Sequence, residues 1–169
     1  MDPEKYIFHP ASLNDINQLA MLETILFHTD QCSRRSFRYL ILHATVIVVR
    51  SRTDDEIFGY AVLLKRKNSR KMRIYSFGIA SHIRQGGVGT KLLGFLETLA
   101  RQANGSMLTL EVSDRNPAGI ALYQKFGFKQ YGFKFGYYQD GSHALLMRKQ
   151  IHQSSISNDY TAHQSYIYQ

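Results

Sequence analysis

This 169-residue chain has two segments in which the residue types and their spacing could support chemistry. The first, Arg84 to Thr90 (RQGGVGT), holds three glycines and an arginine. Glycine allows positive φ and lets a ligand approach the backbone without meeting a Cβ. If a helix begins here, the N–H groups of its first turn lack intrahelical partners and lie at the positive end of the helix dipole. The segment therefore predicts an anion site, most naturally for phosphate, with Arg84 as an added positive charge.

Two well-known phosphate-binding loops are excluded by the spacing of this segment. A Walker A loop requires glycine immediately before the lysine, and Lys91 has no glycine before it. A dinucleotide fingerprint requires a third glycine where Leu92 stands. The pattern that remains is R-x-x-G-x-G, formed by Arg84, Gly87 and Gly89. A tight turn that binds nothing is the competing interpretation.

The second segment runs from Leu110 to Phe128 and contains Glu111 and Tyr123. Apolar residues alternate over 108–112, so Glu111 points to the opposite face of the predicted strand. A carboxylate within so apolar a strand is a candidate base, and a glutamate facing water on an edge strand is the alternative. Tyr123 lies about 100° around its predicted helix from Leu122, so its ring can pack while its hydroxyl reaches out. An ordinary half-buried tyrosine is the alternative there.

A strand and a helix must position the glycine segment. The residues before it favour a strand over 72–79, because β-favouring residues surround four apolar positions. The residues after it predict an amphipathic helix, because apolar residues recur at three- and four-residue steps over 88–103.

A compact helix must carry Tyr123. Asn116 is suited to the N-cap, Pro117 to the first helical position and Gly127 to the position after the C-cap. The side chains expected on the buried stripe of this helix are Ala118, Leu122 and Phe126.

The remaining elements alternate along the chain without a linker or an internal repeat. Strands are expected over 5–9, 45–50, 57–64, 106–112, 128–133 and 144–148, and further helices over 13–26 and from residue 33 onward. The sequence therefore predicts one α/β (α+β) domain over 1–149 with a mixed, mostly antiparallel sheet. Only the crossover after the glycines requires a parallel pair. The polar tail 150–169 receives no role.

The charge and the cysteine content limit which partners and which cellular compartment are expected. The net charge of +8 favours anionic partners: nucleic acid, ribosomes, acidic membrane surfaces or a polyphosphate cofactor. Cys32 is the single cysteine, and Met1 to Lys5 lack the features of a signal peptide, so a cytoplasmic protein is expected. The seven histidines show no metal-ligand spacing, so no metal is expected. No apolar run reaches membrane-spanning length, so no transmembrane segment is expected. Of the candidate anionic partners, the membrane is not among those expected.

Together the two segments resemble the GNAT superfamily of acetyl-coenzyme A-dependent N-acetyltransferases. Arg84-x-x-Gly87-x-Gly89 is similar to the pyrophosphate-binding motif of that superfamily, and 116–128 is similar to its cofactor-side helix. The resemblance covers 5–149 and is greatest to ribosomal-protein alanine and related protein N-terminal acetyltransferases. It implies a twisted sheet with helices on both faces.

The resemblance implies acetyl-coenzyme A as the acetyl donor. The residues that it places at the cofactor are Phe77, Ile79, Arg84, Gln85, Gly86, Gly87, Val88, Gly89, Thr90, Asn116 and Tyr123. It implies that the Ile79 N–H polarises the thioester carbonyl. It also implies that Glu111 takes a proton from the acceptor ammonium, directly or through water, and that Tyr123 protonates the departing thiolate. No nucleophilic residue is required, because the amine attacks the thioester directly.

The expected acceptor is a protein or peptide N-terminus of the ribosomal-protein type. We expect its slot between 31–37 and 135–141, lined by Tyr137 and Tyr138, with Asp140 nearest the ammonium. The chain lacks the usual Asp-Pro before the arginine of the motif and carries Cys32 where these enzymes often have tryptophan. The acceptor therefore stays open to a small-molecule amine (a polyamine, an amino acid or an antibiotic). A non-catalytic RNA- or ribosome-binding module is a further alternative, and the oligomeric state is open between a monomer and a weak dimer.

Overall fold

The computed structural model describes residues 5–152, and its strands form one seven-stranded sheet in the order β1-β2-β3-β4-β5-β7-β6. The strands are β1 (Tyr6–Pro10), β2 (Thr45–Ser51), β3 (Ile57–Lys65), β4 (Lys71–Ile79), β5 (Met107–Ser113), β6 (Lys129–Lys134) and β7 (Ala144–Gln150). The helices are α1 (Ile16–Leu26), α2 (Arg34–His43), α3 (Val88–Gln102) and α4 (Pro117–Lys125), with short 3-10 helices η1 (Leu13–Asp15) and η2 (Ser81–Gly86).

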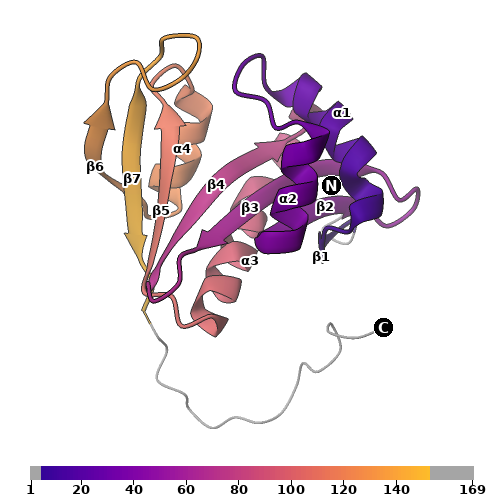
Figure 1. Ribbon diagram of the computed structural model, residues 1–169, viewed down its shortest axis with the longest axis horizontal. Helices are drawn as coiled ribbons and strands as arrows, with labels where there is room; N and C mark the ends of the chain where they lie inside the picture. Colours follow the sequence, from indigo (N-terminus) through magenta and orange to yellow (C-terminus); the bar gives the residue numbers. More distant parts are fainter. Residues whose placement is uncertain (1–4, 153–169) are drawn as a thin grey trace, which may run out of the picture.

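The direction of strand pairing confirms the predicted mixed sheet. Only β4 and β5 pair in parallel, and the crossover between them runs through α3. The other neighbouring strands are antiparallel. Figure 1 shows α1 and α2 in front of the sheet and α3 behind it, so helices cover both faces. This arrangement agrees with the predicted α/β (α+β) class.

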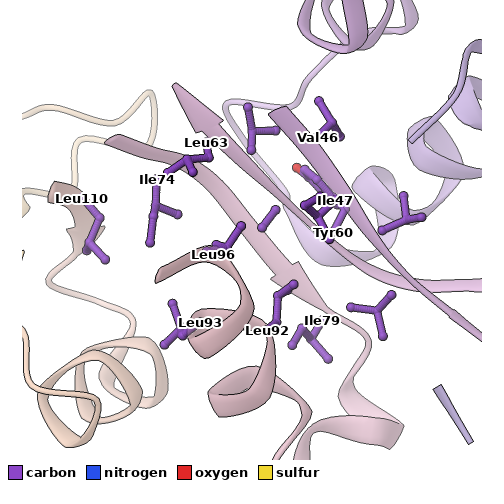
Figure 2. Close-up of a cluster of buried hydrophobic side chains, with 14 of the residues drawn as sticks. Val46, Ile47, Tyr60, Leu63, Ile74, Ile79, Leu92, Leu93, Leu96 and Leu110 are labelled. Atoms are coloured by element: carbon purple, nitrogen blue, oxygen red, sulfur yellow. The ribbon is translucent and has the colours of Figure 1, made fainter. Parts of the chain in front are cut away.

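The main core lies between α3 and the central strands. Leu92, Leu93 and Leu96 of α3 are fully buried, and Figure 2 shows them facing the sheet beside Ile74 and Ile79 of β4. A second layer lies under α1 and α2, where the rings of Phe37 and Tyr60 meet edge to face at 5.3 Å. Burial on both faces explains why β3 reads as an almost continuous apolar run.

The two parallel strands separate halfway along β4. Their register runs from Lys71↔Met107 to Ile74↔Leu110 and goes no further. At the same point the pairing of β4 with β3 skips Tyr75, which makes Tyr75 the extra residue of a β-bulge. A bulge bends the strand and increases its twist. The end of β4 therefore turns away from β5, and Figure 1 shows the two strands meeting at one end and diverging at the other.

Helix capping follows the predicted residue types. Ser33 accepts a hydrogen bond from the Ser36 N–H at 3.1 Å, and the Asn116 Oδ1 accepts one from the Gly119 N–H at 2.9 Å. Gly127 follows α4 with a φ of +98°. The glycine segment differs from expectation, because η2 stands between the predicted strand and helix.

The end of the described chain is part of the fold. β7 runs to Gln150, and the buried Ile151 donates its N–H to the Ser106 carbonyl at 2.9 Å. The remainder of the predicted tail, from 153 to 169, lies outside the described residues.

Candidate active site

A cavity of about 430 Å³ lies at the diverging end of β4, next to the beginnings of α3 and α4. Its walls are formed by Leu26, Phe27, Phe77, Gly78, Ile79, Arg84, Gly87, Gly89, Thr90, Asn116, Ala118, Gly119, Leu122 and Tyr123. Most of the predicted cofactor residues are in this set, and the exceptions are Gln85, Gly86 and Val88. The Val88 side chain is buried in the core. Sequence reasoning missed Leu26 and Phe27, because nothing local connects the end of α1 with the glycine segment.

The glycines of the segment serve different purposes. Gly87 has a φ of +72° and is the N-cap residue of α3, so it requires the left-handed backbone that glycine tolerates. Gly89 lies inside the helix, where a Cβ would approach Leu122 Cδ2 to 3.2 Å. It therefore allows α3 and α4 to pack closely. Among the three glycines of the segment, Gly87 alone has a positive φ.

The backbone at the end of β4 presents polar groups to the cavity. The Ala80 N–H donates to the Phe58 carbonyl of the neighbouring strand at 2.7 Å. In an antiparallel ladder successive residues alternate in direction, so Ile79 directs its N–H and C=O away from β3. The Ile79 carbonyl accepts a hydrogen bond from Arg84 Nε at 2.8 Å, which agrees with this direction. The predicted donor, the Ile79 N–H, therefore points into the gap that opens between β4 and β5.

Tyr123 is held in the wall of the cavity by aromatic contacts. It is 8% exposed, and its ring lies 6.0 Å from that of Phe77 and 5.9 Å from that of Phe128. Burial raises the pKa of Tyr123 well above the usual tyrosine value. The hydroxyl is protonated at neutral pH, as that of an unperturbed tyrosine also is.

The buried stripe predicted for α4 was only partly correct, because Leu122 and Phe126 pack against the core but Ala118 does not. Tyr123 is the buried side chain of this helix, whereas Ala118 is exposed and Leu122 and Phe126 are half-buried. Ala118 and Leu122 line the cavity instead. A periodic apolar pattern predicts which face of a helix is apolar. In α4, part of that apolar face lines the cavity instead of packing in the core.

Glu111 lies on a central strand in a cluster of charges. β5 lies between β4 and β7, but its pairing with β4 ends at Leu110, so the alternative of a glutamate that faces water is decided by the exposure of the Glu111 side chain. That side chain is 15% exposed, and Oε2 accepts a hydrogen bond from Arg73 Nε at 2.8 Å. Lys134 Nζ lies 3.6 Å from Oε1. Arg73 also donates from Nη2 to the Tyr137 hydroxyl at 3.1 Å, so we refer to Glu111, Arg73, Lys134 and Tyr137 as the Glu111 cluster.

The two predicted catalytic residues occupy different parts of the site. Tyr123 lines the cavity, whereas Glu111 belongs to the Glu111 cluster and is not among the residues of the cavity wall. Sequence reasoning did not single out Arg73, although it lies within the strand expected over 72–79. The available signal was its alternation with Met72 and Ile74, which places it inside a strand.

One of the two predicted walls of the acceptor slot, 135–141, contacts Asp30, which lies just before the other predicted wall, 31–37. The Asp30 carboxylate, in the loop between α1 and α2, accepts a hydrogen bond from the Gln139 N–H at 3.0 Å. Tyr137 and Tyr138, which precede Gln139 in the chain, meet edge to face at 5.0 Å. Asp140 instead accepts a hydrogen bond from the Ser142 N–H at 2.9 Å and lies 3.8 Å from Arg115. The carboxylate that bridges the two loops is therefore Asp30.

A buried carboxylate anchors the loop after α1. Glu23 is 2% exposed and accepts hydrogen bonds from the Cys32 N–H at 2.8 Å and the Tyr60 hydroxyl at 2.5 Å. Tyr60 in turn lies 2.7 Å from the Ser76 hydroxyl on β4. Burial raises the pKa of Glu23, and burial beside this carboxylate raises the pKa of the Cys32 thiol to about 12. The thiol is therefore protonated and unreactive at neutral pH.

Within residues 5–152, no three histidine, cysteine, aspartate or glutamate side chains gather in a way that could hold a metal ion. The helices of the same range are all too short or too polar to cross a membrane.

Characterised proteins with similar sequences include several acetyltransferases. An N-alpha-acetyltransferase of Saccharolobus solfataricus is 34% identical over 83 residues, which are 48% of this chain and 50% of that protein. The N-alpha-acetyltransferase RimI of Mycobacterium tuberculosis is 32% identical over 104 residues, 60% of this chain and 64% of that one. A streptothricin acetyltransferase of Streptomyces lavendulae is 29% identical over 98 residues, 56% and 52% of the two chains. The chain thus matches between half and two-thirds of the length of these relatives.

Solved structures share the fold, and a family model identifies the chain. Ard1 of Thermoplasma volcanium superposes with a TM-score of 0.79 at 23% identity, covering 88% of this chain and 99% of that one. The ribosomal-protein-S18-alanine N-acetyltransferase of Escherichia coli gives 0.75 at 19% identity, covering 94% and 99%. At such identities the likeness concerns the fold alone. The model of the acetyltransferase (GNAT) family matches residues 13–128, most of the chain, so the protein belongs to that family.

Proposed function

We propose that the protein is an acetyl-coenzyme A-dependent N-acetyltransferase that acetylates the N-terminal amino group of a protein or peptide of the ribosomal-protein type in the cytoplasm. One observation carries the proposal. The cavity joins the N-terminus of α3, the Ile79 backbone and Tyr123 in a single wall. An anion site, a carbonyl-binding donor and a protonated hydroxyl are the groups that acyl transfer from a phosphate-bearing thioester requires.

The chain's own residues fit the cofactor. The N–H groups at the start of α3 and the Arg84 guanidinium would hold the pyrophosphate, and Gly87 leaves the approach open because a Cβ there would meet nothing within 4 Å. The Ile79 N–H would orient the thioester carbonyl. When bound, acetyl-coenzyme A supplies the electrophilic acetyl group.

Proton transfer is divided between two residues in the proposed mechanism. Glu111 would accept a proton from the acceptor ammonium, directly or through water, because an amine attacks only in its neutral form. Tyr123 would donate a proton to the leaving sulfur from its buried hydroxyl. The position of Tyr123 in the cavity wall supports this role, and its raised pKa does not, because it makes the phenol a weaker acid than an ordinary tyrosine.

The names of the relatives support a protein N-terminus as acceptor, since two of them are N-alpha-acetyltransferases. The streptothricin acetyltransferase supports the second candidate, a small-molecule amine. The two candidate acceptors are distinguished by incubating the protein and acetyl-coenzyme A with N-terminal peptides, polyamines, amino acids and antibiotics that carry an amino group. We expect acetylated peptides by mass spectrometry, and transfer to small amines alone would favour the second candidate.

Calorimetric titration of acetyl-coenzyme A should accompany these incubations. Binding without transfer to any amine would favour a non-catalytic module. Absence of binding would remove the proposed function altogether.

A further inference from the structure

The two carboxylate oxygens of Glu111 face two cations that are held in different ways. Arg73 Nε donates to Oε2 at 2.8 Å, within ordinary hydrogen-bond distance. Lys134 Nζ lies 3.6 Å from Oε1, beyond that distance. One oxygen is therefore tightly bonded, whereas the other has only a loose ionic neighbour.

Arg73 is fixed by several partners at once. It is a β4 residue paired with Thr109 of β5, which places it next to Glu111 on the same face of the sheet. Its Nη2 donates to the Tyr137 hydroxyl at 3.1 Å, and its guanidinium lies 5.4 Å from the centre of the Tyr75 ring. A planar guanidinium can hold two acceptors with fixed geometry. Arg73 thus bonds both Glu111 and Tyr137 and can orient the two side chains.

Lys134 has the properties of a displaceable partner. It is the last residue of the edge strand β6, and its side chain is 47% exposed on a flexible stem. Its ammonium lies 4.7 Å from the centre of the Tyr137 ring. An ammonium between a carboxylate oxygen and an aromatic ring occupies the environment that recognises a cationic amine.

We propose that the Lys134 ammonium occupies the seat of the acceptor ammonium, beside Glu111 Oε1 and the Tyr137 ring, and that an incoming acceptor displaces it. Arg73 remains on Oε2 during this exchange and acts as a positioning residue. The inference rests on the proposed role of Glu111 as proton acceptor. The group that fits this position is the protonated primary amine of the acceptor, which takes the place of the Lys134 ammonium.

The two cations should then have opposite kinetic effects. Replacing Lys134 by Gln removes the competitor, and an exposed ion pair of this kind is weak, so KM for the acceptor should fall by about two- to fivefold. Replacing Arg73 by Gln leaves Glu111 without its orienting partner, so kcat should fall by about tenfold or more. Arg73→Lys keeps the charge but cannot hold both partners, so it should restore only part of kcat.

Steady-state kinetics with a peptide acceptor test the exchange, with Lys129→Gln as the matched control. Lys129 is an exposed lysine at the other end of β6, so its replacement removes the same charge from the same strand. We expect an unchanged KM in the control. An equal fall in KM for Lys129→Gln would mean that long-range electrostatics, and not displacement of Lys134, explains the fall in KM for Lys134→Gln. A raised KM in Lys134→Gln would show that Lys134 helps binding, and either result overturns the proposal.

A second measurement needs no acceptor. Reductive methylation with carbon-13 formaldehyde keeps the charge of each lysine, and the Lys134 resonance is identified by its loss in Lys134→Arg. That resonance should shift in Glu111→Gln, and a resonance that does not respond overturns the pairing. If the wild-type protein acetylates no amine, the proposed function fails, and the magnetic resonance result still decides the contact between Lys134 and Glu111.

Discussion

The proposed cofactor half and the proposed acceptor half of the site are built from different kinds of chemical group. The cofactor half uses backbone groups and apolar walls from the end of β4 and the beginnings of α3 and α4. The acceptor half uses charged side chains and tyrosines from β4, β5, β6 and two loops, which meet through Glu111 and Asp30. A site made of backbone depends on local sequence, whereas a site made of ion pairs depends on how distant segments meet. The donor should therefore be constant within such a fold, and the acceptor should vary.

The largest effect is expected from Tyr123→Phe, which tests whether the cofactor half also performs chemistry. The ring contacts with Phe77 and Phe128 are retained, so affinity for acetyl-coenzyme A should be unchanged. Loss of the proton donor should lower kcat by about 10²–10⁴-fold. Steady-state kinetics measures kcat, and calorimetry measures the affinity for acetyl-coenzyme A. A wild-type kcat would assign Tyr123 to packing alone.

A smaller loss is expected from Glu111→Gln, in the acceptor half. The variant cannot accept a proton, so kcat/KM should fall by about 10²-fold near neutral pH. At high pH the acceptor amine is neutral without assistance, so part of the activity should return. The measurement is a pH profile of kcat/KM. A profile that coincides with that of the wild type would mean that solvent takes the proton.

Gly87→Val should affect the cofactor half alone. A β-branched residue is strained at a φ of +72°, so the start of α3 must shift and the affinity for acetyl-coenzyme A should fall by about tenfold or more. Gly94→Ala in the same helix is the control, since a Cβ there would meet nothing within 4 Å. Calorimetry should show wild-type affinity for Gly94→Ala. Equal affinities in the wild type, Gly87→Val and Gly94→Ala would mean that the phosphates of acetyl-coenzyme A do not bind at the start of α3.

The smallest effect concerns Glu23, which anchors a loop of the acceptor half. Its folded-state pKa is raised by burial, so its charged form costs stability at neutral pH, and this cost disappears as the pH falls through the raised pKa. Between pH 7 and pH 5 the free energy of unfolding of the wild type should therefore rise relative to Glu23→Gln, by about 1 kcal/mol or less. Chemical denaturation at the two pH values measures this. A difference between the two proteins that does not change with pH would mean that Glu23 titrates normally.

The contrast between the halves also explains what the sequence could predict. The glycine segment and the caps of α4 were predictable because hydrophobic period, glycine and capping residues are local signals. The bulge at Tyr75 was not, since it appears only when β4 is paired with β3. Arg73 and Lys134 are 61 positions apart in sequence numbering (134 − 73), and only the folded sheet brings both to Glu111. Glu23 was missed because it meets Cys32 and Tyr60 only after α1 packs on the sheet.

The central claim is that acetyl groups pass from the cavity to an N-terminal amine. The most direct test incubates the protein and acetyl-coenzyme A with an equimolar mixture of a free N-terminal peptide, the same peptide with a blocked N-terminus, and a polyamine. Tandem mass spectrometry then locates each acetyl group. We predict acetyl on the α-amine of the free peptide and an unmodified blocked peptide. Acetyl on the polyamine with an unmodified free peptide would contradict the account.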